Sequence, residues 1–205
     1  MLKIIIISVL FSTSITRVNS QNYFMDTRDN QKYPIIKIGE QIWMAKNLNF
    51  ASVKSYCYDN DLENCKKYGR LYEWESALKS CPEGWHLSTE YEWQELEKFL
   101  GMDERELENQ LNRGDGIADR LKPTGDSGFN EQFGGWGGSD DGLFIAADTI
   151  GTYWTSGEVS FERAWHRDIN INKTTIYRSA VIKSYALCLR CVKDHELPSM
   201  LKIQQ

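Results

Sequence analysis

Five cysteines are spread along this chain of 205 residues, at positions Cys57, Cys65, Cys81, Cys188 and Cys191. In an exported protein cysteines are usually paired in disulfide bonds, whereas in a cytosolic protein they more often bind metals or take part in catalysis. Because the number is odd, one thiol is left over in any pairing within the chain. Whether the protein is exported or cytosolic therefore decides whether these cysteines are interpreted as disulfides or as metal-binding or catalytic residues.

The first twenty residues have the three-part organisation of a secretory signal. Lys3 supplies a positive charge, an apolar run covers residues 4–11, and Ser20 is a small residue just before Gln21. The apolar run is far shorter than the ~20 residues that a membrane-spanning helix needs. We expect a signal peptide over residues 1–20, cleaved before Gln21, and a secreted, cell-surface or periplasmic protein. A lipid anchor is not expected, because Gln21 is not a cysteine.

The charge of the chain argues against nucleic acid as a partner. The sequence has 24 basic and 29 acidic residues, a net charge of −5. Loss of the signal would remove Lys3 and Arg17 but no acidic residue, leaving −7. Binding to phosphates requires clusters of Lys and Arg, and the chain has none. We expect no membrane span in the mature chain, because no further long apolar run is present.

One domain over residues 35–194 is expected, with a poorly ordered polar extension at 21–34 and a loose tail at 195–205. Hydrophobic periodicity predicts helices early and strands late, which is typical of the α+β class. Thr89 and Glu92 predict the start of a helix as a capping-box pair. The predicted elements are two strands around a turn at 39–40, helices at 69–81 and 89–100, and short strands at 153–155, 164–171, 177 and 185–192.

Residues 112–142 are rich in glycine and aspartate and are predicted to form a long loop. Phe129, Phe133 and Trp136 would anchor this loop. An indole on a loop is a stacking surface for a sugar ring or for a partner protein. The alternative is that Trp136 is buried beneath the loop, and the sequence leaves both open. Trp74 and Trp93, in contrast, are expected to pack in the core.

Four blocks of sequence follow one another along the chain, at residues 38–49, 57–72, 81–93 and 189–194. The first block reads IGEQIWMAKNLN, and the fourth reads LRCVKD. The second contains CYDND, a second cysteine and YGRLY, and the third contains CPEGWHL followed by EW. Together they resemble the Fibrobacter succinogenes major paralogous domain family, over almost the whole mature chain. The resemblance implies an exported bacterial domain related to the C-type-lectin-like fold and to formylglycine-generating enzymes. It carries no settled biochemical activity.

The expected fold is therefore an α+β, C-type-lectin-like domain with two early helices and a twisted antiparallel sheet with long loops. Disulfides are expected between Cys57 and Cys65 and between Cys81 and Cys191. Cys188, where the family usually has no cysteine, is expected to be a free thiol. Cys188 and Cys191 have the spacing of a redox or metal motif. Their alternating sequence instead predicts a strand, which would direct the two sulfurs to opposite faces.

Candidate metal ligands are confined to acidic turns. Asp59 and Asp61 alternate within a short cysteine loop and offer oxygens to a calcium ion. Solvated turn residues are the simpler interpretation of such a pattern. No other cofactor is expected.

No catalytic motif stands out. His86, His166 and His195 are isolated from one another, and the chain has no nucleophile elbow, zinc-protease helix or phosphate-binding loop. The related fold makes a formylglycine-generating oxidase the enzyme alternative, but no matching catalytic block is present, and a fold alone does not transmit function.

We expect an exported, non-enzymatic domain that binds a carbohydrate or a protein through residues 123–145, a region where lectin-like folds usually contact ligands. Trp136 would be the anchor, with Asp140 and Asp141 at its rim. A purely structural surface protein is the third possibility.

Overall fold

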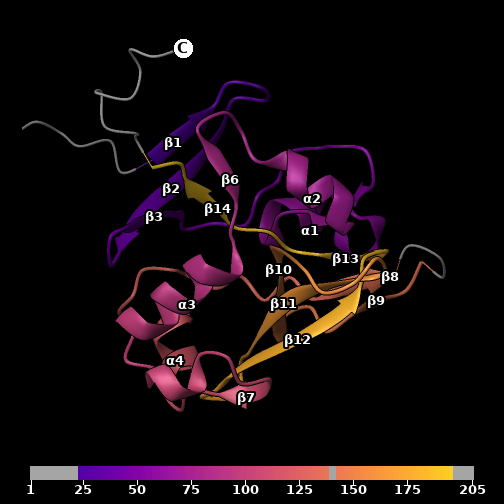
Figure 1. The fold of residues 1–205 in the computed structure, drawn as a ribbon. Coiled ribbons are helices and arrows are strands. Elements are labelled where there is room, and N and C mark those ends of the chain that lie inside the picture. Colours follow the sequence, from indigo (N-terminus) through magenta and orange to yellow (C-terminus); the bar gives the residue numbers. More distant parts are fainter. Residues whose placement is uncertain (1–22, 139–141, 196–205) are drawn as a thin grey trace, which may run out of the picture.

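The structure of the protein is a computed structural model that describes residues 23–138 and 142–195 (Figure 1). The expected signal with its cleavage point before Gln21, the acidic pair Asp140 and Asp141, and residues 196–205 of the expected tail lie outside the described residues.

Three antiparallel sheets contain the strands of the described chain, and with four α-helices they confirm the α+β class. The first sheet has the order β1 (Tyr23–Asp26), β2 (Gln31–Ile38), β3 (Gln41–Met44), β14 (Cys191–Lys193) and β6 (Trp85–Leu87). The second has the order β10 (Ile150–Glu158), β11 (Arg163–Asn170), β12 (Ile176–Ile182) and β7 (Leu111–Arg113). The third has the order β4 (Ser55–Tyr56), β5 (Leu71–Tyr72), β13 (Tyr185–Leu187), β8 (Trp136–Gly138) and β9 (Phe144–Ile145).

The helices alternate with strands along the first part of the chain, and α2, α3 and α4 contact strands of the second sheet. They are α1 (Leu62–Tyr68), α2 (Trp74–Ser80), α3 (Glu90–Phe99) and α4 (Ile117–Leu121), with 3₁₀ turns η1 (Tyr58–Asn60) and η2 (Glu104–Glu106). In Figure 1, α3 and α4 lie on the left of the second sheet, and β8 and β9 lie on the right. This arrangement leaves the two faces of that sheet with different neighbours.

Helix α3 forms as its sequence predicts. Thr89 Oγ1 accepts a hydrogen bond from the backbone N–H of Glu92 at 3.1 Å, and the Glu92 carboxylate accepts one from the backbone N–H of Thr89 at 2.9 Å. These two bonds satisfy donors that the first turn of a helix would otherwise leave free. Trp93 and Leu96 are fully buried on one face of the helix. The predicted core role of Trp93 is thereby confirmed, and Trp74 is buried too.

The predicted helix over 69–81 is only partly right. Leu71 and Tyr72 form β5, which pairs with β4 and β13, and α2 begins at Trp74. Leu78, which has helical spacing to Leu71 and Trp74, is exposed. A two-residue strand buried between two neighbours uses the same apolar residues as a helical turn, so periodicity alone does not separate them.

The N-terminal extension is better ordered than expected. Residues 23–34 form the β1–β2 hairpin of the first sheet. Asp26 is fully buried and receives a 2.7 Å hydrogen bond from Arg28 Nη2, which also donates to the carbonyl of Ser80 at 2.9 Å. The expectation of poor order over residues 23–34 is therefore wrong, because the segment pairs as a hairpin and buries Asp26 against Arg28.

Both expected disulfides are present. Cys57 is bonded to Cys65, and Cys81 at the end of α2 is bonded to Cys191 in β14. Cys188 is a buried free cysteine. Paired cysteines indicate an oxidising compartment outside the cytoplasm. No helix within the described residues is long and apolar enough to cross a membrane.

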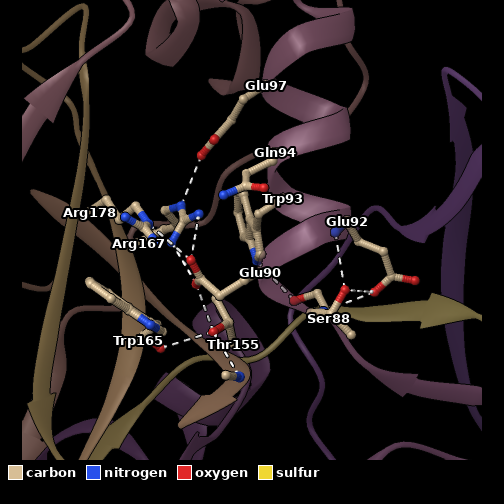
Figure 2. Close-up of polar contacts among 12 residues, drawn as sticks. Ser88, Glu90, Glu92, Trp93, Gln94, Glu97, Thr155, Trp165, Arg167 and Arg178 are labelled. Carbon is tan, nitrogen blue, oxygen red and sulfur yellow. Dashed lines mark hydrogen bonds and ion pairs between the residues drawn. The ribbon is translucent and has the colours of Figure 1, made fainter. Parts of the chain in front are cut away.

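A buried network of charges attaches α3 to the inner face of the second sheet (Figure 2). Arg167 of β11 donates to Glu90 at 2.8 Å and to Glu97 at 2.9 Å, so one guanidinium contacts two successive turns of the helix. Arg178 of β12 donates to Glu90 at 2.9 Å. Arg113 of β7 donates to Glu97 at 2.8 Å. The inner face is therefore closed by α3, and a binding site on this sheet must use the outer face.

Candidate functional site

The strand register of the second sheet gathers polar residues on its outer face. Successive residues of a strand point to opposite faces. Arg167 and Ile169 are fully buried on the inner face, so His166 and Asp168 share the outer one. Asp168 is aligned with Thr152 of β10 and with Tyr177 of β12. Side chains from three adjacent strands thus meet on the open face.

A small cavity of about 180 Å³ opens over these residues, and we call it the Trp136 cavity. Its wall is completed by residues of the third sheet, which borders the outer face. It is lined by Trp136, Thr152, His166, Asp168, Val181, Tyr185 and Leu187. Drug-sized ligands usually occupy about 300–1,000 Å³. The cavity therefore suits a single small ring.

Two stacked aromatic rings form one wall of the cavity. Trp136 of β8 and Tyr185 of β13 have ring centroids 5.1 Å apart and an interplanar angle of 21°. Both side chains are half-buried. The stack holds the indole in place and leaves part of it open. Trp136 thus combines the two roles that the sequence leaves open, since it packs on the protein and also borders a cavity.

Trp136 lies on a strand, so the prediction of an irregular loop at this point is wrong. The glycines around it allow other chain segments to come close. A Cβ at Gly134 would lie 2.7 Å from Cys188 Sγ, and a Cβ at Gly137 would lie 2.8 Å from the Phe144 ring. The glycine-rich sequence therefore reflects tight packing here. Phe129 and Phe133 are buried, as expected for anchors of the segment.

Three polar atoms in the cavity are buried without a well-formed hydrogen bond in the described part of the chain: Thr152 Oγ1, His166 Nδ1 and Asp168 Oδ1. Against the larger effect of burial, the Thr152 side chain still lies close enough to the Asp168 carboxyl to lower its pKa, and the backbone of Ser179 raises the pKa of His166. His166 Nε2 lies 3.6 Å from Asp168 Oδ1, which is too long for a good hydrogen bond. Buried polar atoms in proteins nearly always have partners, and leaving one unpaired costs about 1–3 kcal/mol. Three such atoms lie in the wall of one cavity.

Burial sets the charge of these groups. Burial lowers the pKa of His166 to about 4, and the neighbouring Arg167 guanidinium contributes to the shift. Burial raises the pKa of Asp168 to about 7. His166 is therefore uncharged at neutral pH, and Asp168 changes charge close to neutrality. No lysine or arginine lines the cavity, so it offers no cation to an anionic ligand.

The predicted metal ligands lie elsewhere and do not form a cluster. Asp59 is exposed in η1. Asp61 caps α1, accepting a 2.9 Å hydrogen bond from the backbone N–H of Glu63. No group of three or more His, Cys, Asp or Glu side chains suited to a metal occurs among the described residues. Calcium binding at Asp59 and Asp61 stays a prediction.

The cysteines offer no pair of free thiols. Cys81 and Cys191 are bonded to each other. Cys188 is fully buried, and burial raises the pKa of its thiol, which disfavours the reactive thiolate. Its packing under Gly134 favours a structural role.

Sequence reasoning missed Thr152, His166, Asp168 and Tyr185 as site residues. A signal is present in the segment 164–171, where Arg167 and Ile169 alternate with polar residues. Those polar residues, His166, Asp168 and Asn170, share one face of the strand. Tyr185 gives no such signal, because its ring stacks on Trp136 only through the pairing of β8 and β13, which are distant in sequence.

Comparison with known proteins gives one match. Neither the curated proteins nor the solved structures contain a match to the chain. The family model of the Fibrobacter succinogenes major domain matches residues 36–193, which includes all three sheets apart from β1 and the first residues of β2. The chain thus belongs to the Fibrobacter succinogenes major domain family.

Proposed function

We propose that this domain binds an uncharged carbohydrate in the Trp136 cavity and acts outside the cytoplasm as a secreted or surface-exposed binding module. The observation that carries the proposal is the set of three buried polar atoms without a well-formed hydrogen bond, beside a stacked indole. A sugar presents an apolar face that stacks on an aromatic ring, together with hydroxyl groups that both donate and accept hydrogen bonds.

The chemistry of the cavity favours hydroxyl groups over anionic groups. Asp168 Oδ1 is an acceptor when ionised, and neutral His166 accepts at one ring nitrogen. Thr152 Oγ1 donates or accepts. A phosphate or carboxylate would face the Asp168 carboxylate without a compensating cation. The expected rim residues Asp140 and Asp141 follow β8 directly in sequence and stay part of the proposal.

We also infer that the domain is a relative of the C-type-lectin-like fold. The family resemblance supports this, as do the early helices, the antiparallel sheets and the disulfide from the end of α2 to the last strand. An experimental structure compared with lectin-like domains tests the inference; a different strand connectivity would overturn it.

Substitution of Trp136 tests the binding proposal. Mature protein is screened on a glycan array, and affinities for the bound glycans are measured by calorimetry. Trp136→Ala should weaken binding about 10- to 100-fold, because a stacked indole contributes on the order of 1–3 kcal/mol. Phe161→Ala is the matched control, since Phe161 is 92% exposed on the β10–β11 turn.

The same variants separate a binding role from a purely structural one. If Trp136 only supports the fold, Trp136→Ala should lower stability by roughly 3–5 kcal/mol and leave binding per folded molecule intact. That result, or the absence of any bound glycan, would contradict the proposal.

Thr152→Val gives an independent test. It replaces a buried hydroxyl that makes no well-formed hydrogen bond by a methyl group of similar size, so stability should change by less than about 1 kcal/mol. Affinity should fall about 2- to 10-fold if the hydroxyl bonds to the sugar. Unchanged affinity would remove Thr152 from the site.

A further inference from the structure

A second hollow of about 170 Å³ adjoins the Trp136 cavity on the outer face of the second sheet. Its lining includes Asp168, which also lines the Trp136 cavity. It is completed by Asn112, Ile150, Asn170, Lys173, Thr175 and Tyr177. One carboxylate therefore stands between two hollows, and we call the second one the Asn170 hollow.

The strand register places both hollows on a single face. Asn170 lies two residues beyond Asp168 on β11 and is aligned with Ile150 of β10. Tyr177 of β12 is aligned with Asp168 on one side and with Asn112 of β7 on the other. Because residues two apart on a strand point the same way, the lining continues across the sheet without a change of face.

The Asn170 hollow has the chemistry of a polar binding surface. Asn170 offers its amide N–H donors, because its Oδ1 accepts a 2.8 Å hydrogen bond from the backbone N–H of Asn172. The amide of Asn112 offers donors and an acceptor, and Lys173 and Thr175 add an ammonium group and a hydroxyl group. These groups are loosely held: Lys173 Nζ is 3.4 Å and Thr175 Oγ1 is 3.3 Å from Asn112 Oδ1. Exposed groups with long mutual contacts are free to turn toward a ligand.

We propose that the two hollows form one groove that binds two consecutive units of an oligosaccharide, with Asp168 contacting both units. The proposal rests on the carbohydrate-binding function of the Trp136 cavity and extends it. The unit at Trp136 stacks on the indole. The next unit lies over Tyr177 and forms hydrogen bonds with Asn112, Asn170 and Lys173.

The size of the groove supports this assignment. Each hollow alone is smaller than the range of about 300–1,000 Å³ that is usual for ligand sites, whereas the two together reach its lower end. A single ring would fill only one of them. Binding of two linked units also makes the second contact intramolecular, which raises affinity without a new site on the ligand.

The test uses length series of glucose, mannose, galactose and xylose, each as one, two and four units. Affinities are measured by calorimetry with the mature protein. For the sugar that binds, affinity should rise at least tenfold from one to two units and by less than threefold from two to four.

The double variant Asn112→Ala/Lys173→Ala should remove most of the advantage of two units over one. Asn172→Ala is the matched control: Asn172 is exposed in the adjoining turn and does not line the hollow, so that advantage should persist.

The outcomes distinguish the two proposals. Equal affinities for one, two and four units would overturn the two-unit groove and leave binding at the Trp136 cavity standing. A continued rise from two to four units would overturn the stated length of the groove. Binding of none of the four sugars at any length would overturn the carbohydrate proposal together with this extension.

Discussion

Arg167 and Glu97 form an ion pair in which neither side chain is exposed to solvent, with Nε and Oε1 2.9 Å apart. The same guanidinium contacts Glu90, so β11 is joined to two turns of α3 (Figure 2). Charges buried in this way stabilise a structure only when each keeps its partners. Removal of one partner is therefore the informative experiment.

Arg167→Met should lower the free energy of unfolding by about 3–5 kcal/mol, because it leaves the carboxylates of Glu90 and Glu97 short of a buried partner. Urea denaturation of the mature protein measures the loss. Lys66→Ala is the control: it breaks an ion pair to Glu63 in which both side chains are more than two-thirds exposed, and should cost less than about 1 kcal/mol. Equal effects of the two variants would contradict the assigned role of Arg167.

Asp168 should make stability depend on pH in a defined direction. Its folded-state pKa of about 7 lies above the ordinary value of 3.8, so the folded state favours the protonated form. The wild type should therefore lose stability relative to Asp168→Asn as pH rises from about 4 to about 7. The difference between the two pKa values corresponds to on the order of 4 kcal/mol. Thermal denaturation of both proteins across this range checks it, and a constant difference between them would show that Asp168 titrates normally.

The two disulfides should differ in their contribution to stability. Cys81–Cys191 spans 110 residues, whereas Cys57–Cys65 spans 8. In the chain-entropy model, closing the long loop stabilises the folded protein by about 5 kcal/mol and closing the short loop stabilises it by about 2.5 kcal/mol. Cys81→Ala/Cys191→Ala should therefore lower the denaturation midpoint more than Cys57→Ala/Cys65→Ala. The reverse order would mean that loop length does not govern their effect here.

Local sequence signals were enough for elements whose stability is local. Thr89 and Glu92 start α3 through bonds within four residues, and the Gly39 turn joins β2 to β3. Helix α1 was missed although Asp61 caps it, because its seven residues bury only Cys65 and Tyr68 and so show no extended apolar stripe. Strand β5 was missed because its two residues depend on β4 and β13, which are distant in sequence.

The candidate site was only partly predictable for the same reason. Trp136 was found because an indole among glycines is conspicuous in any sequence. Thr152, His166 and Asp168 come together only through the register of β10 and β11, and their shifted pKa values arise from burial that the sequence does not display.

The position of β14 means that the first sheet can be completed only after the C-terminal part of the domain has been synthesised. In the first sheet, β14 lies between β3 and β6, although it contains nearly the last described residues of the chain. A ribosome makes β3 and β6 long before residues 191–193 exist, so these two strands have no common neighbour during most of synthesis. The sheet closes, and Cys81 acquires its partner, only when the C-terminal strand is added. A chain that must cross a membrane before folding gains from this delay, since the finished sheet cannot form while the last strand is still on the side of synthesis.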